Sequence, residues 1–218
     1  MKLLRAAVLC VFAAAAPFAA ASAQDAEKTL EFKDFSRISI SGIYHLDVDV
    51  GGPFEVTLSG PAEEMGRVEA AVKGGVLKLG QRERLWTDKH NKGRHEGVVA
   101  RISMPALDGL HMSGVVDGEV RGVDSAAFDV AISGVGEMRL HGACARLDAE
   151  VSGVGELDAE GLRCADVRVV VSGVGEATVF AAEAVDAVVS GMGDITVHGQ
   201  PKRVKKSGGL FAEISIRD

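Results

Sequence analysis

The chain has 218 residues, a formal net charge of -7 at pH 7, and 27 Gly beside a single Trp and a single Tyr. The negative charge argues against nucleic acid and against anionic membranes as partners. So few aromatic residues disfavour a conventional globular core and favour a narrow one filled by Val, Ala, Leu and Ile.

The first 23 residues have the features of a secretory signal peptide. Two basic residues precede an Ala-rich apolar run, which ends in the cleavage sequence Ala21-Ser22-Ala23. Pro17 interrupts that run, which is also short for a membrane anchor. We therefore expect cleavage after Ala23 and an exported protein, in the periplasm or at the cell surface. The mature chain, 24–218, has no further apolar stretch long enough for a membrane-spanning helix.

Residues 24–218 are expected to form one domain whose N-terminal half is less regular. Strands are predicted at 36–50, with a bend at Ser41-Gly42, and at 54–58, 68–72, 76–79 and 98–104, with a turn or one helical turn at 61–66. The stretch Gln81–Gly97 breaks the strand pattern and contains several basic residues around Trp86. It predicts an exposed loop, which is either functional or simply solvated.

A repeat of about twenty residues occupies 113–199 and is typical of a solenoid. Its mark is a Ser-Gly-x-Gly-acid turn, preceded by a weaker copy that begins at Ser113, and the intervals between successive Ser residues are 20, 19, 20 and 18. The predicted structural turns consist of Ser133, Gly134, Gly136, Ser152, Gly153, Gly155, Ser172, Gly173, Gly175, Ser190, Gly191 and Gly193.

Between the turns, apolar residues alternate with polar ones. They occupy the positions one, three and five before each Ser, and five and seven after it. This period of two predicts two short strands per repeat, each with one buried face. A second Gly nine residues after most of the Ser residues predicts a second corner. Val135, Val154 and Val174, within the turns, are expected to stack inside the same slim interior.

The end of the chain departs from the repeat. Residues 200–218 contain a basic run followed by Phe211, Ile214 and Ile216. Because the last coil of a solenoid would otherwise offer its open edge to another chain, we expect this segment to form a C-terminal cap.

Stacked coils place equivalent residues in columns, and the first column to consider is acidic. It comprises Asp117, Glu137, Glu156, Glu176 and Asp194. Carboxylates about 4.8 Å apart could share Ca²⁺, which makes these residues candidate metal ligands. Alternatively, they splay into solvent and hinder association, and the weak, screened repulsion between exposed charges favours this alternative.

A second column contains Asp129, Asp148, Arg168 and Asp186, four residues before each Ser. Acids beside an Arg would suit a calcium-assisted polysaccharide lyase or hydrolase, the alternative function for this chain. Outward polar columns occur in any solenoid, however, so we predict no catalytic residues, no enzyme activity and no cofactor.

Cys144 and Cys164 each lie eight residues before a repeat Ser, which places them on adjacent coils. An exported protein meets an oxidising compartment, so a disulfide is possible, and two free, partly buried thiols are the alternative.

The repeat and the segments before it resemble the head GIN domain family, also described as auto-transporter adhesins of unknown function. Besides the Ser-Gly-x-Gly-acid turns, the similar segments are 35–42, 76–79 and 102–107, and the resemblance covers roughly 33–217. It implies an all-β, right-handed parallel β-helix with two-strand coils, similar to pectin-lyase-like folds. It also implies a role in cell adhesion without known catalytic residues.

We therefore expect an exported, non-enzymatic module for cell-envelope interaction or adhesion. Its partner would be an unknown envelope protein or glycan, and oligomers are possible.

Overall fold

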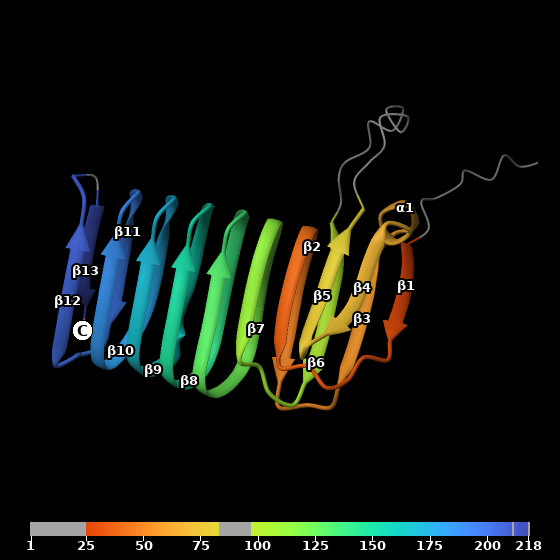
Figure 1. Cartoon of the computed structure of the whole chain (residues 1–218), viewed down its shortest axis with the longest axis horizontal. Coiled ribbons are helices and arrows are strands. Elements are labelled where there is room, and N and C mark those ends of the chain that lie inside the picture. The colour runs from red at the N-terminus through yellow and green to blue at the C-terminus, as the bar shows by residue number, and fades with distance from the viewer. Residues whose placement is uncertain (1–24, 83–96, 211, 218) are drawn as a thin grey trace, which may run out of the picture.

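The computed structural model describes residues 25–82, 97–210 and 212–217. The predicted signal peptide (1–23), residues 83–96 of the predicted loop, and Phe211 lie outside them. The described residues form an all-β parallel solenoid of about five turns, so the predicted fold class is confirmed. Its coils stack one beside the next along a single long axis (Figure 1).

Long bent strands make up the regular part of the stack. In spatial order they are β2 (Arg37–Val50), β7 (Gly109–Ile132), β8 (Val135–Val151), β9 (Val154–Val171), β10 (Val174–Val189) and β11 (Met192–His198). Each pairs in parallel with the next. The Ser-Gly turns separate successive strands from β7 onward. Ser41-Gly42 lies opposite Ser113-Gly114, so β2 is an earlier coil of the same repeat.

The N-terminal end is partly antiparallel. Its elements are β1 (Asp25–Leu30), β3 (Glu55–Pro61), α1 (Ala62–Met65), β4 (Val68–Lys73), β5 (Val76–Gln81) and β6 (Val98–Met104). Strands β5 and β6 pair in parallel with successive halves of β2, whereas β1–β3, β3–β6 and β4–β5 are antiparallel. Strand β1 was not predicted, because its polar sequence lacks alternation and only pairing with β3 extends it. Within the described ranges, no helix is long and apolar enough to cross a membrane.

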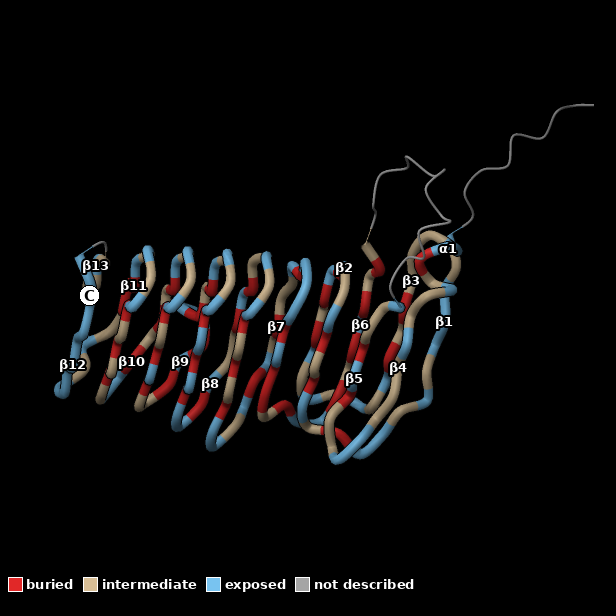
Figure 2. The backbone as a smooth tube through the Cα atoms, turned by 45° about the horizontal axis from the view of Figure 1, so that its top comes forward, coloured by how far each residue is buried: buried red, intermediate tan, exposed pale blue. Residues whose placement is uncertain are grey.

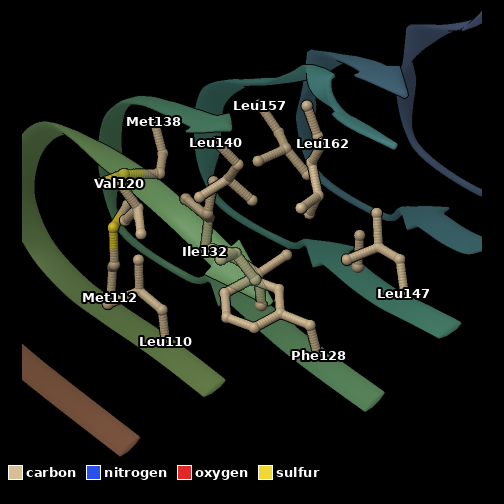
Figure 3. Close-up of a cluster of buried hydrophobic side chains, with 14 of the residues drawn as sticks. Leu110, Met112, Val120, Phe128, Ile132, Met138, Leu140, Leu147, Leu157 and Leu162 are labelled. Carbon is tan, nitrogen blue, oxygen red and sulfur yellow. The ribbon is translucent and has the colours of Figure 1, made fainter. Parts of the chain in front are cut away.

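The interior is a slim aliphatic column. In every repeat from Ser133 to Ser190, the side chains one, three and five before the Ser and five and seven after it are buried, as predicted. Figure 3 shows Phe128, Ile132 and Leu140 lying together in this interior. The alternation of buried and exposed residues runs along each coil (Figure 2).

The prediction that Val135, Val154 and Val174 lie in the interior is wrong. They are 51%, 56% and 46% exposed, although they stack in register. Successive side chains of an extended chain point to opposite faces. Residues two positions after an outward-facing Ser therefore also face outward, and the inward positions of the turn are taken by Gly.

The glycines of the turns allow the coils to approach closely. A Cβ atom at Gly153 would lie 1.9 Å from the carbonyl oxygen of Gly134, and one at Gly173 would lie 2.0 Å from that of Gly153. Gly191 has the same relation to Gly173, at 2.0 Å. Backbone atoms block the place of any side chain, so these positions accept only glycine unless the coils separate.

Unequal repeat lengths are absorbed at the second corner. The register shifts fall between Val120 and Val123 in β7, between Arg139 and Gly142 in β8, and within 179–184 of β10. The Ser-Gly turns therefore remain aligned from coil to coil although the intervals between them vary.

Cys144 and Cys164 lie opposite each other on β8 and β9 and form a disulfide, with Cα atoms 4.5 Å apart. The bond closes a segment with a sequence separation of 20. Loop closure of this size stabilises a fold by about 3 kcal/mol through the restricted unfolded chain.

The final coil consists of β12 (Arg203–Gly208), paired with β10, and β13 (Ala212–Arg217), paired with β11. Lys206 lies opposite the buried Ala187, at a position that faces inward in every earlier coil. Its Nζ donates a hydrogen bond to the carbonyl oxygen of Ile214, 3.0 Å away. All of β12 is exposed at this end of the stack, and the charge of Lys206 stands where the earlier coils have an aliphatic side chain.

The close approach of the turns predicts the effect of one methyl group. Gly173→Ala should lower the free energy of unfolding by at least about 2 kcal/mol, because the new Cβ meets a backbone oxygen that cannot rotate away. The measurement is urea unfolding followed by circular dichroism. Gly209→Ala is the control, since a Cβ there has open space within the described residues. Equal stability of the two variants would contradict close packing at the turn.

The final coil predicts a change in self-association. Lys206→Val should promote end-to-end association, because it removes the charge from the inward position and extends the apolar end. Size-exclusion chromatography with light scattering over a range of concentrations measures the effect. Lys202→Val makes the same change of charge at an exposed position beside β12 and should leave the mass unchanged. A Lys206→Val chain with the mass of the parent would argue against a capping role for 200–218.

Candidate functional site

A ladder of exposed aliphatic side chains follows the turn edge, the edge of the solenoid formed by the Ser-Gly turns. We call it the aliphatic ladder. Its members occupy the second position after each turn Ser and are all at least one-third exposed: Ile43, Val115, Val135, Val154, Val174 and Met192. Each is the register partner of the next. At the strand spacing, the ladder is about 24 Å long. Figure 2 shows the exposed turns following one another along this edge.

Sequence reasoning missed this surface, although the necessary signal was present. The ladder position is apolar in all six coils, but it has the parity of the exposed Ser and acidic positions rather than that of the core. Following that parity through the turn would have placed these residues outside. Since the fold gives an outward residue no core to fill, the repeated aliphatic choice needs another cause.

Several of the turn Ser hydroxyls have hydrogen-bond partners in a neighbouring coil. Ser133 Oγ donates to the carbonyl oxygen of Met112 at 3.1 Å, and Ser152 Oγ donates to that of Ile132 at 3.4 Å. The same two carbonyls also accept from the backbone N–H of these Ser residues, so each hydroxyl adds a second contact to the preceding coil. This arrangement explains a Ser in the turn without a nucleophilic role.

The predicted acidic residues lie beside the aliphatic ladder. Glu137, Glu156, Glu176 and Asp194 are successive register partners, and the backbone N–H of Glu137 donates to Asp117 Oδ1 at 2.9 Å. Partial desolvation raises the pKa of Glu156, and the neighbouring charges of Glu137 and Glu176 raise it further. The turn edge therefore combines an aliphatic stripe with a negative one.

No metal centre accompanies the acidic column in the part of the chain that the structure describes. There, no group of three or more His, Cys, Asp or Glu side chains is placed to hold a metal ion. The carboxylates share one line but do not converge on one point, as a calcium site with several oxygen ligands would require.

The Asp and Arg residues of the second column form ion pairs on a different face. Asp129 contacts Arg37 and His111, both at 2.8 Å. Arg168 contacts Asp148 at 3.5 Å, and Asp186 Oδ2 contacts Lys205 Nζ at 3.1 Å. All three acids thus have a cationic neighbour within the column or beside it. This column lines a groove to which we return below.

Comparison with known proteins agrees with this architecture. The family model described as "Putative auto-transporter adhesin, head GIN domain" matches residues 34–201. No curated protein matches the chain.

Two crystal structures have the same overall arrangement. One, described as a putative adhesin from Bacteroides fragilis, is 23% identical and has a TM-score of 0.72, over 90% of this chain and 98% of that one. Another, described as a putative adhesin from Parabacteroides distasonis, is 18% identical and has a TM-score of 0.50, over 89% of this chain and 97% of that one. At these identities the similarity establishes the fold alone.

The raised pKa of Glu156 predicts how stability changes with pH. The folded state binds the proton more tightly than the unfolded state does, so stability falls as the pH rises through the raised pKa. Glu156→Gln, which is always neutral, should therefore be more stable than the parent at neutral pH. The difference should vanish below the ordinary pKa range of glutamate and shrink in high salt.

Thermal melting of both chains from about pH 3 to about pH 8 measures this difference. The interval extends to either side of the ordinary pKa of glutamate, about 4.3. Glu150→Gln, an exposed glutamate opposite Val170 and outside the acidic column, is the control. A larger gain from Glu150→Gln than from Glu156→Gln would contradict repulsion within the column.

Proposed function

Because this chain belongs to the head GIN domain family, as its motifs predicted, we propose that it is an exported, non-enzymatic β-solenoid module for cell-envelope interaction or adhesion. The observation that carries the proposal is the aliphatic ladder. Six apolar side chains stand in register on a surface where the fold requires none.

Exposed apolar side chains in one continuous stripe, bordered by polar groups, are typical of a surface that binds another molecule. The stripe here is bordered by the turn Ser residues on one side and the acidic column on the other. The backbone positions of the ladder are fixed by the glycines of the turn. A partner therefore meets a rigid surface, and little conformational entropy is lost from this side of the interface.

The negative charge of the acidic column limits which kinds of partner can bind at this edge. The acidic column beside the ladder would repel a second copy of the same edge, and it would also repel anionic glycans and lipid headgroups. A basic, partly apolar protein surface is complementary to both stripes. We therefore assign the turn edge to an envelope protein with these properties.

The ion pairs support a function without catalysis. Asp148 and Arg168, the strongest candidates for a polysaccharide-cleaving enzyme, contact each other at 3.5 Å in an exposed ion pair. A lyase or hydrolase needs a base or acid with a suitable pKa, poised beside the bond that breaks. An adhesion module needs only a repeated surface, which the stack supplies.

A binding experiment tests the proposal. The mature chain is immobilised and exposed to purified bacterial envelope proteins and envelope glycans, and bound fractions are assayed for cleavage products. We expect a basic protein to bind and no glycan to be cleaved. The triple variant Val135→Ser, Val154→Ser, Val174→Ser should weaken that binding at least about tenfold, since each side chain loses buried apolar area.

Val170→Ser is the control, because Val170 is also outward-facing on β9 but lies before the turn Ser172 and outside the aliphatic ladder. Circular dichroism checks that all variants fold. Binding that survives the triple variant would refute the turn edge as the site. Product formed from any glycan would refute the non-enzymatic role.

A further inference from the structure

We propose that a groove near the C-terminal end of the solenoid is a second binding site, for an acidic oligosaccharide. The groove has a volume of about 500 Å³ and crosses β8, β9, β10 and β12. Its lining includes Ala184 together with Val167 and Val185, whose side chains are buried in the core, whereas Asp and basic side chains form its rims. It lies on the segments of these strands that lead into the Ser-Gly turns, away from the aliphatic ladder and the acidic column.

A small residue opens the groove. Arg146, Asp166, Ala184 and Arg203 are successive register partners in one outward column. The methyl group of Ala184 is shorter than the side chains above and below it, which leaves room over β10 for the side chain of Arg203. The guanidinium of Arg203 spans this space and contacts Asp166 two coils away, at 3.1 Å.

The charges of the groove leave one cation available. Three ion pairs, Asp148–Arg168, Asp166–Arg203 and Asp186–Lys205, use every acid in its lining. Among the described residues, Arg146 has no ion-pair or hydrogen-bond partner. In a protein of net charge -7, this is a local excess of positive charge, and its exposed guanidinium can bind a carboxylate in a bidentate manner.

The rims also suit hydroxyl groups. Asp186 Oδ1 has no hydrogen-bond partner, and a small rotation of this side chain would offer that oxygen to a ligand hydroxyl. A sugar ring presents C–H groups on its faces and hydroxyls at its edge. The methyl group of Ala184 and the polar rims match that division. The groove is open along the solenoid axis for about 14 Å, or three coil spacings, which suits a short stretch of a polymer.

An extended peptide fits the groove less well. Peptides commonly bind along a sheet by adding a strand to a free edge. Here β9 pairs with β8 and β10, and β10 pairs with β9 and β12, so the backbone groups of β9 and β10 under the groove are already paired, and among the described strands of the groove only β12 keeps a free edge. Recognition must therefore use side chains, which favours a ligand rich in hydroxyl and carboxylate groups.

Calorimetry of the mature chain at low ionic strength tests the site. The probes are a panel of tetrasaccharides of uronic acids, their carboxyl-reduced neutral counterparts, and tetraglutamate as a peptide with the same number of carboxylates. We expect at least one uronate to bind, more tightly than its neutral counterpart and than tetraglutamate, with affinity that falls as salt is added.

Two variants locate the binding. Arg146→Gln should weaken the uronate about tenfold, the value of one charged hydrogen-bonding partner. Ala184→Leu should abolish binding without a change of charge, because it fills the space over β10. Arg139→Gln removes the same charge from the first half of β8, before the second corner, and should leave the affinity for the uronate unchanged. Melting curves establish that each variant folds.

Several outcomes would overturn the proposal. The first is that every uronate binds no more tightly than its neutral counterpart. The second is that tetraglutamate binds as tightly as the uronates. The third is that Arg146→Gln and Arg139→Gln lose the same amount of affinity for the uronate. None of these outcomes bears on the turn edge, which the triple valine variant tests separately. Binding at the groove would equally survive that triple variant.

Discussion

The close approach of glycine backbones at the Ser-Gly turns is the constraint on which the rest of the structure depends. The carbonyl oxygen of one turn occupies the place where a Cβ of the next would stand, as at Gly153 and Gly134. This contact fixes the register at one edge of every coil. Variation in repeat length is then confined to the opposite corner, where the register shifts occur. Core columns, surface columns and the disulfide between Cys144 and Cys164 all follow from that shared register.

A fixed register turns the surface into a set of independent columns, and each column can be explained separately. The inward columns must be aliphatic because the interior is narrow. The turn glycines must lack side chains. The outward columns face no such demand, so a residue type that recurs there reflects something other than folding. By this argument the aliphatic ladder says more about function than the core does, although the two contain the same residue types.

Much of this architecture could be predicted from the sequence, because period-two alternation and regular turns are local signals. The buried columns, the turns and the solenoid followed from them. The direction of Val135 did not, because its apolar character was given more weight than its parity. The groove could not have been predicted at all. It depends on Ala184 lying between Asp166 and Arg203, and that neighbourhood needs the exact register through an irregular corner.

The same register also gives the two surfaces different net charges, since the lining of the groove holds four basic residues and three acids. Carboxylates gather along the turn edge, whereas Arg146, Arg203 and Lys205 line the groove on the segments that lead into the turns. In a globular protein of this net charge, a local cationic site would be weakened by acids on every side. A solenoid keeps its columns apart over its whole length, and solvent screens charges separated by more than about 10 Å. One rigid module can therefore present an acidic, apolar edge to a basic protein and a cationic groove to an anionic polymer. Neither surface need compromise the other, because each consists of outward positions that the core does not use.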